Sequence, residues 1–340
     1  MTDGVCFAHG SLRGRSQLST APHSLYSGEY DLAVLVSSWD RRATCVTAAK
    51  DFRAAACLVV LFNERDRQGL RDAHDFAILD FARTSSQRVI QVGADSLDLR
   101  GTWLKLLHEL GESRRRIKRP LRLFIDASVC PRYYLLGLVA TSLSSGIASH
   151  VSISYAEGRY PRKEKNTAED ISFTYGQWKS VAVPGLEGRY SPGLKRFFLV
   201  SIGFEGWKTM RAVTRADPDR VSLLHGKPGT NDDYPERSIR DNAELINHYK
   251  IPPEQILNAH AGDAIAAWQV LSERAIERTD ENAYFLCSGT KPHSLALGLR
   301  ALSLKRPAVL YNLPEAHEVV AIESNGKFWR FDVQSVTVPI

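Results

Sequence analysis

The sequence predicts an α/β protein made of two Rossmann-like domains with mostly parallel sheets. Short apolar runs alternate with longer segments of helical periodicity from Asp31 onward, and the same alternation begins again near Phe197. This pattern is typical of parallel strands joined by right-handed helical crossovers. The length of 340 residues, 44% of them apolar, agrees with two domains because one domain commonly takes about 100 to 200 residues.

In the first half, apolar runs of strand length are separated by segments with a period near that of a helix. Strands are predicted at 31–36, 57–62, 88–92, 121–125 and 150–155. Helices are predicted at 43–56, in the segment that ends near 84, at 97–117 and at 131–145. The last of these helices has almost no polar face, so we expect it to be buried between layers.

The second half repeats the alternation. Strands are predicted at 197–202, 220–224, 255–259, 283–287 and 308–311. Helices are predicted at 206–214, at 236–249, from an N-cap at Asp263, and at 295–304. Two further strands, 318–323 and 327–333, surround the Ser324-Asn325-Gly326 turn and predict a C-terminal β-hairpin.

Composition divides the chain into four parts. Residues 1–27 contain Gly, Ser and Arg without an apolar period, which predicts a flexible N-terminal arm. Residues 28–155 and 196–340 are predicted as the two Rossmann-like domains. The segment 156–195 is rich in Gly, Pro, Arg and Lys and is predicted as a basic linker or insert, because a connection this long is often functional or disordered.

The composition also bears on the class of protein. The N-terminal segment lacks the apolar run of a secretory signal, and no stretch approaches the roughly 18 apolar residues of a membrane span. The five cysteines have no CxxC spacing and are typical of reduced thiols in the core. We therefore expect a cytoplasmic protein with no membrane segment, no metal site and no cofactor.

The turn after the predicted strand 283–287 is the strongest candidate ligand site. It reads Ser288-Gly289-Thr290-Lys291 and leads into a helix. Gly289 allows close approach of the backbone, and Thr290 is a good N-cap. The N–H groups of the helix start and the Lys291 ammonium suit a phosphate or carboxylate. The alternative is an ordinary connection between a strand and a helix.

A second turn follows the first predicted strand of the same half. Here Ser201, Gly203 and Glu205 lie in a glycine-containing turn that ends at Gly206. Two glycines at this spacing are a weak phosphate signature, because the third glycine of the dinucleotide fingerprint is missing. The loop 225–233 has the composition of a flexible ligand gate, although Pro and Gly also occur in any long turn.

Polar side chains also follow two strands of the first half, at the sheet edge where ligands bind. The first group is Ser37, Ser38, Trp39, Asp40 and Arg41. Trp39 suits a stacked base, whereas Asp40 beside an arginine also fits a helix-capping ion pair.

The other group is centred on Asp126, which follows the strand at 121–125. Asp126 suits a general base or a ribose-hydroxyl acceptor. It also suits an ion pair with Arg122 or Arg132, so a structural role is equally open.

The net charge of +6 and the isoelectric point near 9.0 favour polyanionic partners. The densest basic run is predicted to contact nucleic acid and consists of Arg114, Arg115, Arg116, Lys118 and Arg119. The alternative is a solvated helix end whose cations complement the helix dipole. The familiar phosphate-loop, nucleophile-elbow and zinc-protease motifs are absent from the sequence.

The second half resembles the CARF family, the Rossmann-fold ligand sensors of CRISPR systems. The resemblance lies in the turn 201–206 and in Ser288-Gly289-Thr290-Lys291, followed by Pro292-His293-Ser294-Leu295-Ala296. Ser288 stands where that family commonly has glycine. The resemblance implies that both turns face one ligand, often a cyclic oligoadenylate, across a dimer. The implied ligand-facing residues are Ser201, Gly203, Ser288, Gly289, Thr290 and Lys291.

Three functions follow from these observations. The first is a sensor that binds a nucleotide or cyclic oligonucleotide in a prokaryotic antiviral system, and the same resemblance implies a homodimer. Two fused Rossmann-like halves also resemble the SAVED sensors. The second is an enzyme acting on a nucleotide or nucleic acid through Asp40, Asp126 or Glu205. The third is a scaffold subunit that binds an effector protein in a larger defence complex.

Overall fold

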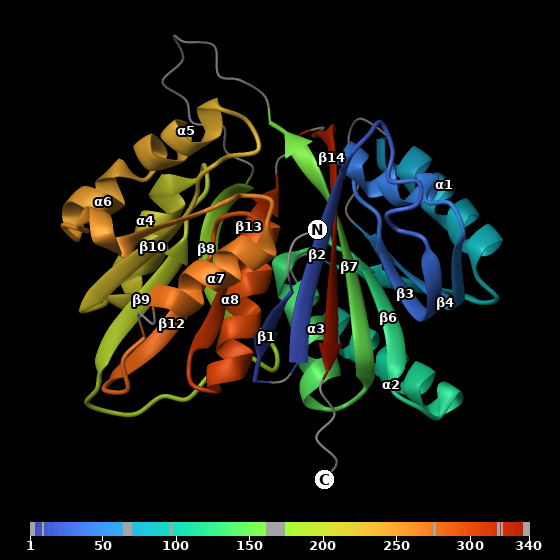
Figure 1. The fold of residues 1–340 in the computed structure, drawn as a ribbon, viewed down its shortest axis with the longest axis horizontal. Helices are drawn as coiled ribbons and strands as arrows, with labels where there is room; N and C mark the ends of the chain where they lie inside the picture. The colour runs from blue at the N-terminus through green and yellow to red at the C-terminus, as the bar shows by residue number, and fades with distance from the viewer. Residues whose placement is uncertain are drawn as a thin grey trace. The chain divides into compact units, whose positions relative to one another are not determined.

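The computed structural model describes residues 4–8, 10–63, 70–95, 98–160, 174–274, 277–317, 320 and 322–335. It divides into two compact units, each with its own sheet (Figure 1). The first unit contains residues 9–162 and 319–340, and the second contains residues 4–8 and 163–318. The second unit is therefore inserted into the chain of the first.

The first unit has a sheet whose strand order is β2-β14-β7-β6-β3-β4-β5. The strands from β7 to β5 run parallel, and β14 runs antiparallel to both β7 and β2. The strands of this unit are β2 (Gly10–Leu18), β3 (Gly28–Val36), β4 (Phe52–Phe62), β5 (Val89–Ala94), β6 (Leu121–Asp126), β7 (Ala148–Arg159) and β14 (Glu323–Ser335). Its helices are η1 (Arg41–Ala48), α1 (Leu70–Ser85), α2 (Leu99–Ile117) and α3 (Arg132–Ser144).

The second unit has a six-stranded sheet with the order β11-β10-β9-β12-β13-β8. Only the edge strand β8 runs antiparallel to its neighbour among these described strands. The strands are β8 (Thr174–Ala182), β9 (Lys195–Ser201), β10 (Arg220–Gly226), β11 (Ile256–Ala259), β12 (Glu281–Cys287) and β13 (Ala308–His317), with β1 (Val5–Phe7) against α7 and α8. The helices are α4 (Gly206–Ala216), α5 (Asp233–Asp241), α6 (Ala243–His248), η2 (Pro253–Gln255), α7 (Ala264–Arg274) and α8 (Lys291–Leu304).

Helices cover both faces of the second sheet (Figure 1). Helix α7 packs beside α8, and α4 packs beside α5 and α6 on the opposite face. The core on the α4 side includes Phe198, Val213 and Leu245, which are buried. Burial of such apolar side chains is the main free-energy gain of folding, at roughly 25 cal/mol for each Å² removed from water.

The predicted α/β class with two mostly parallel sheets is confirmed. Helix α3 is buried around most of its circumference, as its apolar sequence predicts. The N-cap at Asp263 is also confirmed, because its Oδ1 accepts from the N–H of Ile265 at 2.8 Å. These features depend on residues close together in the sequence.

The expected flexible arm at 1–27 is wrong for Gly10–Leu18. This segment forms β2, which pairs with β14 from Lys327↔Leu18 to Ser335↔Gly10. Main-chain hydrogen bonds of a strand need no apolar alternation, so a segment rich in Gly, Ser and Arg gave no sign of the pairing.

The predicted helix 43–56 is also partly wrong, because its second half belongs to β4. Ala54 and Ala56 pair with Tyr30 and Leu32 of β3 in a parallel ladder. Alanine favours helices in isolation, but the ladder and burial between neighbouring strands override that preference.

The predicted domain boundaries differ from the two units. Residues 156–195 are not simply a linker, since β7 continues to Arg159 and β8 begins at Thr174; the residues between, 161–173, lie outside the described ones. Residues 318, 319 and 321 of the strand predicted at 318–323 lie outside the described residues as well. The strand predicted at 327–333 lies in β14, whose antiparallel partners are β7 and β2.

The predicted helix 236–249 is divided at Asn242 into α5 and α6. The Asn242 side-chain amide donates to Gly203 O and to Ser238 O, each at 2.8 Å. These bonds tie the break between the helices to the turn after β9.

Candidate functional site

The strand order of the second unit reverses between β9 and β12. The chain leaves β9 toward β10 on one side, whereas β12 leads to β13 on the other. Helices diverge at such a topological switch point, and α/β proteins bind ligands outside the carboxyl ends of the strands there. The two predicted turns, 201–206 and 288–291, follow these two strands.

The structure brings the two turns into backbone contact, as predicted. Ser201 Oγ accepts a hydrogen bond from the Gly289 N–H at 3.0 Å. A Cβ on Gly203 would lie 2.7 Å from Ser288 O, and one on Gly289 would lie 2.9 Å from Ile202 O. Both glycines are therefore needed for this close approach.

Two predicted ligand-facing residues use their side-chain hydroxyls for hydrogen bonds within the protein. Ser201 is buried, and its hydroxyl holds the Gly289 turn. Thr290 caps α8 by accepting from the His293 N–H at 3.4 Å, and its hydroxyl donates to Ala261 O at 2.7 Å. Ser201 and Thr290 thus fix the shape of the edge, while Ser288 and Lys291 are only half-buried.

The loop 225–233 joins the same edge. The Lys227 N–H donates to Ala259 O at 2.9 Å, and the Ala261 N–H donates to Pro228 O at 2.9 Å. The start of the expected gate is therefore held by main-chain bonds. The exposed Lys227 side chain adds a cation to the carboxyl edge.

Glu205 forms a structural ion pair at the start of α4. It pairs with Lys208 one helical turn later and accepts from Thr174 Oγ1 at 3.0 Å. Lys208 is 2% exposed, and its ammonium also donates to Thr174 O at 2.7 Å. The carboxylate that the sequence offered as a catalytic acid is thus bound to a buried cation.

A buried histidine stands behind the α8 turn. His293 donates from Nε2 to His260 O at 3.2 Å, and its Nδ1 has no hydrogen-bond partner among the described residues. Burial is the main cause that lowers the pKa of His293 to about 4, and the neighbouring His225 and His260 contribute to this lowering. The imidazole therefore stays neutral in the folded protein at neutral pH.

We expect this histidine to make the protein less stable in mild acid. Because the pKa of His293 is lower in the folded state than the usual 6.5, only the unfolded chain takes up the proton between these values. Stability should fall as the pH drops below about 6.5, by about 2 kcal/mol at pH 5 from this residue. Urea unfolding at pH 7.5 and pH 5 measures the loss, and His293→Gln should remove it.

The exposed His248 gives the control for that comparison. His248→Gln should leave the difference between the two pH values as it is in the parent. If His293→Gln shows the same pH dependence as the parent, the neutral buried imidazole is not its source.

The predicted group after β3 in the first unit is largely self-paired. Asp40 is buried, accepts from the Arg42 N–H at 2.9 Å and forms an ion pair with the Arg42 guanidinium at 2.6 Å. The Trp39 ring lies under the Arg71 guanidinium, 5.0 Å from its centroid. These contacts agree with the capping alternative for Asp40.

The remaining members of this group are also in contact with neighbours. Arg41 is exposed and pairs with Glu323. Ser37 is buried, and its N–H donates to Val60 O of β4 at 3.0 Å. Ser38 O lies 2.7 Å from His74 Nδ1.

Asp126 is buried in a network of hydroxyl groups. Its Oδ1 accepts from Ser128 Oγ at 2.7 Å and from Ser154 Oγ at 3.1 Å. Ser128 Oγ in turn accepts from the Ala156 N–H at 3.0 Å. Asp126 therefore links the ends of β6 and β7, which is a structural role of a kind the sequence did not suggest.

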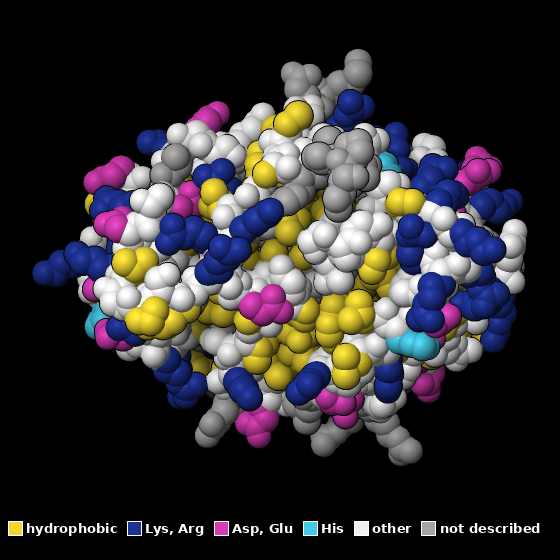
Figure 2. Space-filling model, turned by 90° about the horizontal axis from the view of Figure 1, so that it is seen from below, with side chains coloured by type: hydrophobic (Ala, Val, Ile, Leu, Met, Phe, Trp, Pro, Cys, Tyr) yellow, Lys and Arg dark blue, Asp and Glu magenta, His cyan; other side chains and the backbone are white. Residues whose placement is uncertain are grey.

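The predicted nucleic-acid run occupies the end of α2. Arg119 forms a bidentate pair with Asp31 through two bonds of 2.8 Å, and Arg115 pairs with Glu112 at 2.6 Å. Lys118 is the left-handed C-cap of the helix, whose last turn contains Arg114 and Arg116. Figure 2 shows Lys and Arg over much of the face seen from below, densest on the side where α2 lies in Figure 1.

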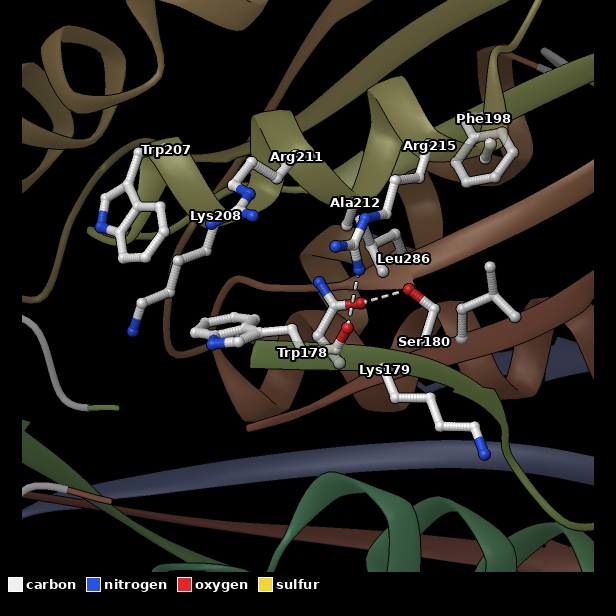
Figure 3. A pocket seen from close by; sticks show the side chains of 13 residues that line it. Trp178, Lys179, Ser180, Phe198, Trp207, Lys208, Arg211, Ala212, Arg215 and Leu286 are labelled. Atoms are coloured by element: carbon white, nitrogen blue, oxygen red, sulfur yellow. Dashed lines mark hydrogen bonds between the residues drawn. The ribbon is translucent and has the colours of Figure 1, made fainter. Parts of the chain in front are cut away.

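Sequence reasoning missed a basic and aromatic cavity of about 300 Å³ beside α4. It lies between α4 and β8, over the middle of the second sheet (Figure 3). Its side chains come from distant parts of the chain, for example Trp178, Arg211 and Asn312. The amphipathic pattern of α4 was the one sequence feature that could have indicated this cavity. The opposite wall was not foreseen, because β8 lies in the segment 156–195, which was predicted as a linker.

Among the described residues, no helix is long and apolar enough to cross a membrane. The same residues contain no group of three or more His, Cys, Asp or Glu arranged to hold a metal ion. No protein-family model and no curated protein matches the chain.

Proposed function

We propose that this protein is a sensor or regulatory protein that binds a nucleotide-like anion at the switch point of its second unit. The observation that carries the proposal is the backbone contact between the turns after β9 and β12, where α/β sheets commonly bind ligands. The resemblance of these turns to the CARF sensors is the reason for naming a cyclic or linear oligonucleotide. The same resemblance supports a role in antiviral defence.

Lys291 is the side chain on which this proposal depends most. It is half-buried at the first position of α8, where the helix dipole favours a negative charge. The exposed Lys227 and the half-buried Ser288 supply a second cation and a hydroxyl on neighbouring turns. Ser201 and Thr290 hold the two turns in place through their hydrogen bonds to Gly289 and Ala261.

Calorimetry against a panel of linear and cyclic oligonucleotides tests the proposal. Lys291→Ala should weaken binding of the active compound at least about tenfold, because a hydrogen bond to a charged group contributes about 1.5–3 kcal/mol. Lys50→Ala, at an exposed lysine of the first unit, is the matched control and should bind as the parent does. If no compound binds, or if Lys291→Ala binds as well as the parent, the proposal fails.

The same experiment separates a sensor from an enzyme. A sensor returns the bound compound unchanged after incubation, which chromatography of the nucleotide fraction measures. Turnover that is lost in Glu205→Gln, Asp40→Asn or Asp126→Asn would instead assign catalysis to one of these carboxylates.

A further inference from the structure

A groove lies on the second unit beside the residues that follow the turn 201–206, and neither that turn nor 288–291 lines it. Helix α4 forms one wall, and β8 forms the other. Its floor is apolar and consists of Phe198, Leu286 and Leu310 from three adjacent strands. We call this surface the α4–β8 groove; Figure 3 shows Arg211 and Arg215 on α4, with Arg215 extending toward β8.

The α4–β8 groove is strongly positive. Lys179, Arg211 and Arg215 are exposed along it. Among the described residues, none of these three cations has a carboxylate partner; Arg215 donates to the Trp178 carbonyl at 2.9 Å. No carboxylate is among the described residues that line this cavity. Their charges are therefore available to an anionic ligand.

Two indole rings lie at one end of the groove. Trp178 and Trp207 have ring centroids 6.0 Å apart, and the Lys208 ammonium lies 4.1 Å from the Trp178 ring. Lys208 itself is neutralised by Glu205. Both tryptophans are half-buried. Partly exposed indoles beside cations are the side chains on which unpaired bases stack.

The groove also contains two hydrogen-bond donors that the described residues leave unmatched. Ser180 Oγ donates to Asn312 Oδ1 at 2.7 Å, which directs the oxygen of this amide toward β8. The Asn312 amide nitrogen and the Trp178 indole nitrogen are buried without a hydrogen-bond partner in the described part of the chain. Buried donors are nearly always paired, so these two favour a ligand with acceptor atoms.

The surface continues beyond the first cavity. A second cavity of about 650 Å³ shares Phe198, Ala216 and Leu310 with it. Tyr284 stacks on Phe198 there, with ring centroids 5.0 Å apart, and Tyr190 is 68% exposed. Cations and aromatic rings thus occur together across two adjoining cavities.

We propose that the α4–β8 groove binds single-stranded nucleic acid. The cations would contact phosphates, the aromatic rings would stack on bases, and the Asn312 and Trp178 donors would meet base or phosphate oxygens. A duplex presents only its backbone and stacked bases, so it would use the charges and leave the rings unused. The site is distinct from the switch point, and Lys291 takes no part in it.

Fluorescence anisotropy with a labelled single strand of about ten nucleotides tests this inference, since nonspecific sites commonly span about 4–16 nucleotides. The double variant Arg211→Gln with Arg215→Gln should weaken binding at least tenfold, and Trp207→Leu should weaken it at equal salt. Arg240→Gln, at an exposed arginine outside both cavities, should bind like the parent. Binding should also fall as salt rises, because cations contact phosphates.

Each other outcome would overturn the assignment. Equal binding of single strand and duplex would mean that surface charge alone, without base stacking, accounts for the binding. Loss of binding only in a variant of Arg114, Arg115 and Arg116 would assign it to α2. Binding of an acidic peptide but of no nucleic acid would identify a protein partner. Because the arginine variants change exposed side chains, they should keep the parent's unfolding midpoint even if Trp207→Leu does not.

Discussion

Replacing Gly206 with alanine is expected to lower the free energy of unfolding by about 3 kcal/mol or more, the upper range for overpacking. A Cβ at this position would lie 1.7 Å from Asp241 O and 2.4 Å from its carbonyl carbon. Both atoms belong to the backbone at the junction of α5 and α6, so no side-chain rotation can relieve the contact. The first turn of α4 would have to move away from that junction. Urea unfolding of the parent and the variant measures the cost.

Gly111 provides the matched control for this substitution. It lies within α2, and the nearest atom to a Cβ there would be the Arg115 guanidinium nitrogen at 3.9 Å. Gly111→Ala should therefore stabilise the protein by about 0.5–1 kcal/mol, because alanine loses less backbone entropy in a helix. Parent-like stability of Gly206→Ala would contradict the close packing of α4 on Asp241.

Gly206 also illustrates what the sequence could not reveal. In the sequence it belongs to a glycine-containing turn after a strand, which suggested a weak phosphate signature. The structure shows instead that this glycine is needed because it packs against the backbone of Asp241, about a tenth of the chain away in sequence. A single sequence cannot separate these roles, because the partner of a glycine is set by tertiary packing.

The fold class was predictable because its signals are local. Strand and helix periods, the Thr290 cap and the Asp263 cap each depend on a few neighbouring residues. The pairing of β2 with β14 joins the two ends of the chain, and the pattern of either segment does not specify the other. The same holds for β8, whose partner β13 lies more than a hundred residues away.

The candidate sites show the same division. The ends of β9 and β12 were predictable as neighbours, because parallel strands end at one edge of a sheet. Which side chains are engaged within the protein itself was not predictable: Ser201 accepts from the Gly289 N–H, and Asp126 accepts from the hydroxyls of Ser128 and Ser154. The α4–β8 groove could not be predicted, because one of its walls is the edge strand β8, whose position the sequence did not indicate.

Replacing Arg220 with methionine is expected to cost about 3–5 kcal/mol, the usual result of leaving a buried charge without its partner. Arg220 Nε and Nη2 bond the two oxygens of Glu281 at 2.9 and 2.5 Å. The Glu281 side chain is 4% exposed, and the guanidinium carbon lies 3.8 Å from the centroid of the Phe197 ring. This pair ties the starts of β10 and β12 across β9. Methionine keeps the apolar contact with Phe197 and removes only the charge and its hydrogen bonds.

A double-mutant cycle with Glu281→Leu separates the value of the pair from the cost of breaking it. If the main penalty is the unpaired carboxylate, the variant with both substitutions should be more stable than Arg220→Met alone, because no buried charge remains. Arg240→Met, at an exposed arginine, is the control and should change stability by no more than about 0.5 kcal/mol. Additive losses in the double variant would mean that the two side chains stabilise their strands independently. The bidentate bonds would then contribute little, despite their geometry.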